Sequence, residues 1–387
     1  MSQLGGAGGA GGAGGAGGAG GAGGAGGAGG AGGIGGAGGS IVGTLGDVYA
    51  NPVMIDALIH SREGTIVVPE VPPSSYDYYG PSTTTIDAPG EMDRWEPWVR
   101  AYIAVGEMLQ GVTFQASTGS FQVLSSGNPI AEIERPAKTT FENQIPLVLS
   151  WAQLRNERAT EILAQIDPQY AFWSSIVPLR PDRTRWTLEL LNMVLQFCVY
   201  VEMRFKHALG CYRPVDYNAE VQPMITTPGH GTFPMGHATQ TYAICYVLRQ
   251  LLKLDTLPQL KWVIDQLDRV SARITTNRVI AGVHFPADSM AGRMLGVALG
   301  EYFVGRCTAS QPFLDRKFLA ATGIDLFSTT DFNPFHTAPS TPTIPSQDLS
   351  QGPLYSAANT GTTVTPSPLM QYLWGKAQYE WTGRFGV

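Results

Sequence analysis

A helical segment that is apolar almost all round, residues 186–206, limits how this chain can fold. Its apolar side chains would surround a helix on nearly every side, which is typical of a helix buried inside a bundle. Three later segments, 236–252, 260–275 and 286–304, place apolar residues three and four positions apart, the spacing of one helix face. Strand-like alternation is weak and allows one short strand pair within 113–147. The sequence therefore predicts an all-α fold, a helical bundle with long loops.

The two ends of the chain differ in composition from this helical region. Residues 5–39 repeat Gly-Gly-Ala with one interruption at Ile34, which leaves too little apolar surface to offset the entropy of ordering the segment. The C-terminal region is rich in Pro, Thr and Ser and ends in an aromatic segment. We predict a Gly/Ala low-complexity tail over 1–40, an α-helical catalytic domain over 41–330, and a C-terminal extension over 331–387 that packs on the domain.

Charge and hydropathy exclude several classes of protein. The formal net charge is −6 and no run of like charges occurs, whereas a nucleic-acid-binding surface needs clustered Lys and Arg. The best membrane candidate, Leu190 to Tyr200, is too short to cross a bilayer. The first residues, MSQLGGAGG, lack the basic and apolar regions of a secretory signal. We expect a soluble protein that binds neither nucleic acid nor membrane, with a cytoplasmic location favoured and a homo-oligomer left open.

Five basic side chains lie at the ends of the predicted helices rather than on their faces. They are Lys206, Arg213, His237, Arg278 and His284. The predicted helix N-termini at Gly236 and Pro286 would add backbone N–H donors and the positive end of a helix dipole. Guanidinium groups hold oxygen atoms with forked hydrogen bonds, and a lysine adds a point charge. This arrangement predicts one pocket that binds a tetrahedral oxyanion.

Three strings resemble the signature shared by vanadium haloperoxidases and type-2 phosphatidic acid phosphatases. They are KHALGCYRP at 206–214, FPMGH at 233–237 and NRVIAGVHFPAD at 277–288. The signature itself runs K-x6-RP, then PSGH, then SR-x5-H-x3-D. Because all three strings occur in this order within residues 186–305, the match is far more specific than a single motif. The resemblance implies an enzyme with the helical bundle of this superfamily.

The resemblance also implies which residues would hold a bound anion. Its oxygen atoms would contact Lys206, Arg213, Arg278 and the backbone N–H of Gly236. His284 would be the axial ligand of vanadium, or the nucleophile toward phosphorus in a phosphatase. His237, on the opposite side, would act as a general acid–base. Asp288 would accept the other ring N–H of His284 and so fix its tautomer.

The chain departs from the signature at two positions, and a third position bears on the halide. Met235 occupies a cofactor-contact position where the signature has serine, and a thioether donates no hydrogen bond. The lost contact amounts to about 1–3 kcal/mol for a charged acceptor. Asn277 also replaces a serine but keeps donor capacity. His230 corresponds to a position where bromide-oxidising haloperoxidases carry a second histidine, so it favours bromide; its alternative role is a turn residue between glycines.

These residues together predict a vanadate-dependent haloperoxidase that oxidises halide, bromide in preference, with hydrogen peroxide. The expected cofactor is vanadate, and the expected partners are hydrogen peroxide, a halide and, where a bound molecule is halogenated, a small organic substrate. Two alternatives stay open. One is a soluble acid phosphatase that hydrolyses phosphomonoesters through a phosphohistidine. The other is a non-catalytic relative that binds an oxyanion, which Met235 favours.

Overall fold

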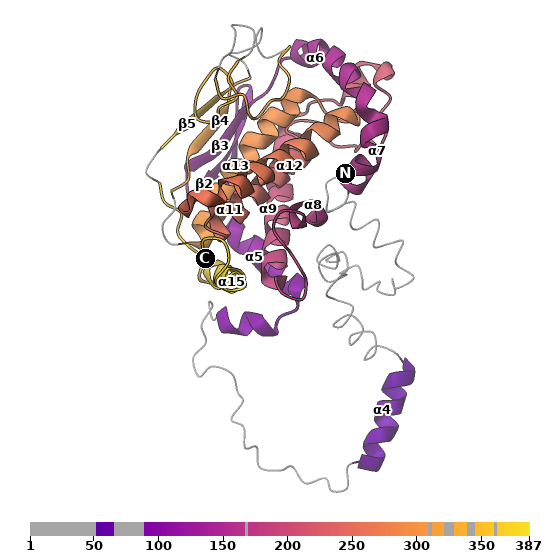
Figure 1. The fold of residues 1–387 in the computed structure, drawn as a ribbon, viewed down its shortest axis with the longest axis vertical. Coiled ribbons are helices and arrows are strands. Elements are labelled where there is room, and N and C mark those ends of the chain that lie inside the picture. Colours follow the sequence, from indigo (N-terminus) through magenta and orange to yellow (C-terminus); the bar gives the residue numbers. More distant parts are fainter. Residues whose placement is uncertain are drawn as a thin grey trace.

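The computed structural model describes residues 52–65, 89–166, 169–308, 312–320, 329–338, 345–359 and 362–387. The predicted Gly/Ala tail lies outside these residues. The four apolar segments form helices that pack against one another in the bundle (Figure 1). They are α9 (Arg185–Leu209), α11 (Gly236–Leu251), α12 (Lys261–Ile280) and α13 (Pro286–Cys307).

The closest helix packing in the bundle is between α11 and α13, because α13 places glycine at every fourth position of the contact. A Cβ atom on Gly292 would lie 2.6 Å from the carbonyl oxygen of Met235. A Cβ atom on Gly296 would collide with the carbonyl oxygen of Thr239. The missing side chains therefore let the two backbones touch. This contact sets the distance between the N-termini of α11 and α13. His237 lies in the first turn of α11, and His284 lies just before the start of α13.

The prediction of an all-α fold is wrong, because the chain also forms a five-stranded mixed sheet. Helices account for 59% of the described residues and strands for 10%. The strands, in sheet order, are β1 (Val112–Ser117), β2 (Ser120–Ser125), β3 (Asn128–Glu134), β4 (Asp315–Phe318) and β5 (Tyr355–Ala358). The β3–β4 pair is parallel and the other pairs are antiparallel. Strands β4 and β5 are too short to show alternation, and β4 pairs with a strand about 180 residues earlier.

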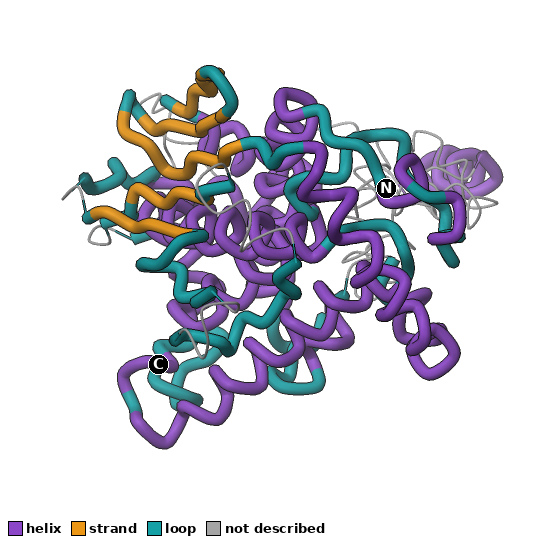
Figure 2. Tube along the Cα trace, turned by 90° about the horizontal axis from the view of Figure 1, so that it is seen from above, coloured by secondary structure: helices purple, strands orange, loops and turns teal. Residues whose placement is uncertain are grey.

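The sheet lies along one side of the helical bundle (Figure 2). Its aromatic side chains make edge or tilted contacts with aromatic residues of the bundle. Phe121 on β2 packs against Phe205 on α9 with ring centroids 5.1 Å apart, and Phe318 on β4 packs against Phe233 at 5.8 Å. Phe233 lies just before the start of α11. The sheet thus supports the loop that leads into one of the predicted site helices.

The described residues form further helices besides these four. The α-helices are α4 (Pro52–Thr65), α5 (Pro97–Leu109), α6 (Lys138–Trp151), α7 (Arg155–Ala164), α8 (Tyr170–Ser174), α10 (Pro214–Tyr217) and α15 (Pro368–Tyr379). The 3-10 helices are η2 (Pro89–Arg94), η3 (Ala152–Leu154), η4 (Ala219–Val221), η5 (Leu254–Thr256) and η6 (Pro258–Leu260). Within the described residues, no helix combines the length and apolarity needed to cross a membrane.

The described parts of the C-terminal region contact the bundle directly. Glu380, which follows α15, accepts hydrogen bonds from the backbone N–H groups of Trp186 and Thr187 at 2.8 and 2.9 Å. A carboxylate at this position satisfies unpaired N–H groups in the first turn of α9. Trp381 is fully buried and donates its indole N–H to the Thr187 hydroxyl at 2.9 Å. The domain limits themselves stay a prediction.

The α11–α13 contact generates a stability prediction. Gly296→Ala should lower the free energy of unfolding by about 1–3 kcal/mol, because the new methyl group forces the two helices apart. Gly375→Ala is the matched control, since Gly375 lies in α15 and has nothing within 4 Å of an added Cβ. There alanine should raise stability by up to about 1 kcal/mol through helix propensity. Urea unfolding measures both, and equal effects would contradict the close contact.

Candidate oxyanion site

A cavity of about 100 Å³ opens where α9, α11 and α12 meet the loop before α13. Its polar lining consists of Glu202, Lys206, Arg213, Thr226, His230, Gly236, His237, Gln240, Arg278 and His284. Its other lining residues are Ile166, Ile225, Pro228 and Val283. Seven of the nine predicted site residues therefore line one cavity. The remaining two, Met235 and Asp288, do not line it.

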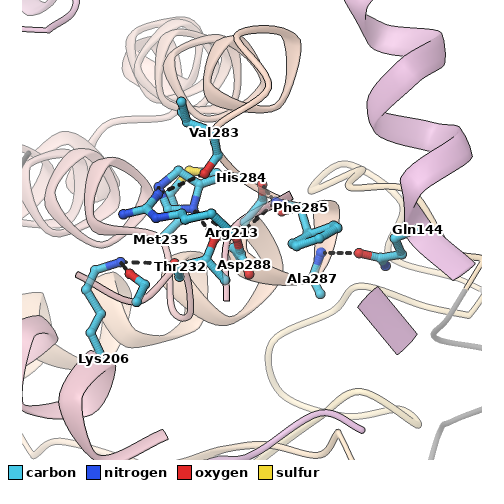
Figure 3. A network of polar contacts seen from close by, with 12 residues as sticks. Gln144, Lys206, Arg213, Thr232, Met235, Val283, His284, Phe285, Ala287 and Asp288 are labelled. Carbon is cyan, nitrogen blue, oxygen red and sulfur yellow. Dashed lines mark hydrogen bonds and ion pairs between the residues drawn. The ribbon is translucent and has the colours of Figure 1, made fainter. Parts of the chain in front are cut away.

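His284 is held by a hydrogen-bonded pair with Asp288 (Figure 3). The ring Nδ1 lies 2.8 Å from Asp288 Oδ2, which also accepts from the backbone N–H of Phe285 at 2.9 Å and from the Thr232 hydroxyl. Since an ionised carboxylate only accepts, Nδ1 carries the ring proton. The Nε2 atom then presents a lone pair, and Arg213 Nη1 lies 2.9 Å from it.

Burial shifts the pKa of both members of this pair toward the neutral form. Burial raises the pKa of Asp288 to about 6, against the lowering effect of the Thr232 and Phe285 hydrogen bonds and of two nearby cations. Burial lowers the pKa of His284 well below its usual value, and the positive charges of Arg213 and Lys206 lower it further. A neutral imidazole at this position can act as a ligand or a nucleophile.

Arg213 joins the segments on either side of the cavity. Its guanidinium donates from Nη1 to the carbonyl oxygen of Val283 at 2.8 Å and from Nε to that of His230 at 3.2 Å. Its Nη2 lies 3.2 Å from Nδ1 of the His230 ring. Burial lowers the pKa of His230 to about 3, and Lys206 and Arg213 also lower it. The half-buried His230 is therefore neutral, and its buried Nε2 has no hydrogen-bond partner among the described residues.

Lys206 lies near the end of α9, and two backbone carbonyls accept hydrogen bonds from its ammonium group. The Nζ atom donates to Gly231 at 3.2 Å and to Thr232 at 3.0 Å. The side chain is only 2% exposed. Burial lowers the pKa of Lys206 to about 7, with a further contribution from the positive charge of Arg213. A bound anion would restore the charged form of this lysine, because an opposite charge favours the cation.

Arg278 has two buried hydrogen-bond donors without a partner among the described residues. Its side chain is 1% exposed, and Nη2 donates to the carbonyl oxygen of Ile162 at 2.9 Å and to Gln165 Oε1 at 3.3 Å. Within the part of the chain that the structure describes, Nε and Nη1 have no partner. Buried donors are almost always satisfied, so two free ones on a single guanidinium indicate a ligand contact. Burial lowers the pKa of Arg278 to about 10, which leaves it charged at neutral pH.

His237 is a neutral imidazole with one nitrogen free. Its Nε2 lies 2.9 Å from the carbonyl oxygen of Gln165, and a carbonyl only accepts, so Nε2 carries the ring proton. Its Nδ1 has no hydrogen-bond partner among the described residues and presents a lone pair. Burial lowers the pKa of His237 well below its usual value, and the adjacent Arg278 charge adds to the shift. The ring can accept a proton but has no readily released proton of its own.

Met235, the predicted cofactor contact, does not line the cavity. Its side chain is fully buried, and the residue is the N-cap of α11. Its backbone N–H donates to the carbonyl oxygen of Asp288 at 3.0 Å, which ties the start of α11 to the start of α13. Asn277 does not line the cavity either, and it donates to Gln165 Oε1 at 3.0 Å. Neither residue replaces the donor of the signature serine.

The sequence analysis missed several residues of the site, among them Gln165 and Glu202. Gln165 anchors both His237 and Arg278, but it lies more than 70 residues before either of them and belongs to no motif. Glu202 lines the cavity one helical turn before Lys206, and its carboxylate oxygen Oε1 packs against Gly236. The spacing of four residues from Lys206 on one helix was a usable signal, because such residues share a helix face.

The comparison with protein families agrees with this geometry. Residues 186–306 match the model of the PAP2 superfamily. This stretch runs from the start of α9 to the end of α13 and contains every predicted site residue. The predicted resemblance to this superfamily is therefore confirmed over this stretch. No curated protein matches the chain significantly.

The neutral state of His237 generates a prediction about stability and pH. In the unfolded chain a histidine takes up a proton below about pH 6.5, whereas folded His237 does not because its pKa is depressed. Acid therefore favours unfolding through this group. The free energy of unfolding of the wild type should fall by about 1 kcal/mol relative to His237→Gln between about pH 6.5 and pH 5.5. Urea unfolding at several pH values measures it, and a constant difference would show that His237 titrates normally.

Proposed function

We propose that this protein is a vanadate-dependent haloperoxidase that oxidises halide, bromide in preference, with hydrogen peroxide. The state of His237 carries the proposal. A phosphatase requires this residue to enter the reaction already protonated on Nδ1, so that it can protonate a leaving oxygen, but burial and Arg278 lower its pKa. A haloperoxidase cycle begins with the opposite state, a neutral imidazole that first accepts a proton from peroxide and only then returns it.

The donor set supports an oxyanion of the vanadate type. Lys206, Arg213 and Arg278 would hold its oxygen atoms, with a further donor from the first turn of α11 at Gly236. The unpartnered Nε and Nη1 of Arg278 fit this role. His284 would bind through Nε2, whose lone pair results from the Asp288 hydrogen bond on the other ring nitrogen. When bound, vanadate would supply the centre at which hydrogen peroxide becomes electrophilic.

The proton transfers follow from the two histidines. His237 would take a proton from hydrogen peroxide onto Nδ1 and return it to the oxygen atom that leaves as water. The three cations would withdraw charge from the peroxide and so favour attack by bromide. One hydrogen peroxide, one bromide and one proton would give hypobromous acid and water. Bromide is oxidised by two electrons and the O–O bond of peroxide is broken.

The surroundings of His230 fit a halide position. His230 borders the same cavity beside Arg213, so a halide there would meet a positive charge and a neutral imidazole. We assign His230 to the halide position on this basis.

Acid phosphatase activity is the second candidate, and the His284–Asp288 pair favours it. An imidazole with its Nδ1–H held by a carboxylate presents Nε2 as a nucleophile toward phosphorus. The same cations would stabilise the five-coordinate phosphoryl transition state. The two activities therefore use the same residues of the site. They differ in the protonation state of His237 that each requires at the start of the reaction.

Reconstitution with orthovanadate separates these functions. The vanadate-treated protein should brominate a phenolic dye in the presence of hydrogen peroxide and bromide, and His284→Ala should abolish this activity because it removes the ligand. Hydrolysis of a chromogenic phosphate ester, assayed without vanadate, should be absent. Hydrolysis without bromination would replace the proposal with the phosphatase. Absence of both activities would leave a non-catalytic oxyanion-binding protein.

Arg278 gives a binding prediction that is independent of turnover. Arg278→Gln should weaken orthovanadate binding by about 1.5–3 kcal/mol, or roughly ten- to more than a hundredfold in Kd, because it removes a buried charge with free donors. Arg273→Gln is the matched control on the same helix, since Arg273 is 52% exposed and pairs with Glu161 at the surface. Isothermal titration calorimetry measures both affinities. Equal Kd values for the two variants would rule out an Arg278 contact.

A further inference from the structure

Glu202 is a buried acid inside a site built for an anion. Its side chain is 1% exposed and lines the same cavity as Lys206, His237 and Arg278. Only Gln240 donates to it among the described residues, from Nε2 to Glu202 Oε1 at 3.0 Å. The second carboxyl oxygen, Oε2, is buried without any hydrogen-bond partner in the described part of the chain. An ionised carboxylate with one bare oxygen would be costly in this position.

The neighbouring charges do not supply the missing partner. Lys206, one turn further along α9, directs Nζ to the carbonyls of Gly231 and Thr232. The described residues show no ion pair between Lys206 and Glu202. The other titratable groups around Glu202 are Cys198 on α9, His237 on α11 and Arg278 on α12. None of them donates a hydrogen bond to the Glu202 carboxyl group.

The charge balance of the cavity favours a neutral Glu202 when a di-anion binds. Three cations, Lys206, Arg213 and Arg278, face two carboxylates, Glu202 and Asp288. With both carboxylates ionised the group carries a formal +1, and with Glu202 protonated it carries +2. A protonated Oε2 also turns the bare oxygen into a donor, which would remove the repulsion between the carboxylate and the ligand and replace it with a hydrogen bond.

We propose that Glu202, as a neutral carboxylic acid, donates a hydrogen bond from Oε2 to the bound oxyanion. This inference rests on the proposed oxyanion site. Glu202 would replace the donor that Met235 lacks, since it approaches the start of α11 from the opposite helix. Its Oε1 lies 2.6 Å from where a Cβ of residue 236 would be, so only glycine at position 236 leaves room for this carboxyl group.

The environment of the carboxyl group is consistent with this proton state. Burial raises the pKa of Glu202 to about 7, although Lys206 and the Gln240 hydrogen bond oppose the shift. An oxyanion in the cavity would raise it further, because a nearby negative charge disfavours ionisation. Gln240 is the positioning residue, since its amide holds Oε1 and thereby leaves Oε2 as the protonated atom.

Calorimetric titration with sulfate and with orthovanadate at about pH 6 tests the proposal without any turnover. Glu202→Gln keeps a donor of the same shape, and its Kd should stay within about threefold of the wild type. Glu202→Met has similar size but no donor, and its Kd should rise by about tenfold or more, the usual effect of losing a hydrogen bond to a charged group. A Glu202→Met variant that binds as tightly as the wild type, or more tightly, would overturn the proposal, because the native carboxylate would then be repulsive or inert.

An infrared difference spectrum provides a second readout that a purely structural role would not change. Sulfate binding should perturb the C=O stretch of a protonated carboxylic acid in the wild type, and this band should be missing in Glu202→Gln. An unchanged band in that variant would assign the proton to another acid and contradict the proposal. If the wild type binds neither anion, the oxyanion site fails together with this inference. If it binds vanadate without bromination, only the haloperoxidase proposal fails.

Discussion

The carboxylate of Asp288 connects the segments from which the site is built. Its Oδ2 accepts hydrogen bonds from the His284 ring, the Phe285 backbone N–H and the Thr232 hydroxyl. The backbone carbonyl oxygen of Asp288 accepts a further hydrogen bond from the backbone N–H of Met235. These bonds join the loop before α11 to the first turn of α13. The glycines of α13 allow this joint to form, because they let the two helix backbones touch behind it. The position and tautomer of His284 follow from this contact.

Burial is the second determinant of the site, since it shifts every titratable group toward its neutral form. The pKa values of Lys206, Arg213, Arg278 and three histidines are lowered, while those of Glu202 and Asp288 are raised. Desolvation is the largest cause in each case. A cavity of this kind holds charge that is poorly compensated by the protein alone, so an oxyanion that brings the opposite charge is stabilised on entry.

Two histidines that stay neutral give the site its chemical character. One presents Nε2 because a carboxylate holds its Nδ1–H, and the other presents Nδ1 because a backbone carbonyl holds its Nε2–H. The same type of side chain thus presents a different ring nitrogen at each position, because its hydrogen-bond partner differs. This difference in hydrogen-bond partners, rather than the residue type, sets which nitrogen of each ring is unprotonated.

The sequence by itself determined the four long helices and the residues at their ends. Helical periodicity and the spacing within each motif are local properties, so Lys206, Arg213, His237, Arg278 and His284 were identified before any coordinates were considered. The three strings also sufficed for the superfamily, because each lies within a dozen residues. That these five residues line one cavity was a hypothesis, and only the three-dimensional structure could test it.

Only the tertiary structure decided the sheet, the anchoring role of Gln165 and the place of Glu202. Strand β4 has four residues and pairs with β3 across about 180 positions, so no local pattern contained that pairing. Gln165 holds His237 through its backbone carbonyl, which any residue type possesses, and Arg278 through its side-chain oxygen, and it belongs to no motif. Met235 is buried and does not line the cavity, which depends on how α11 packs against α13. These features arise from long-range packing, which the order of amino acids specifies only through the complete fold.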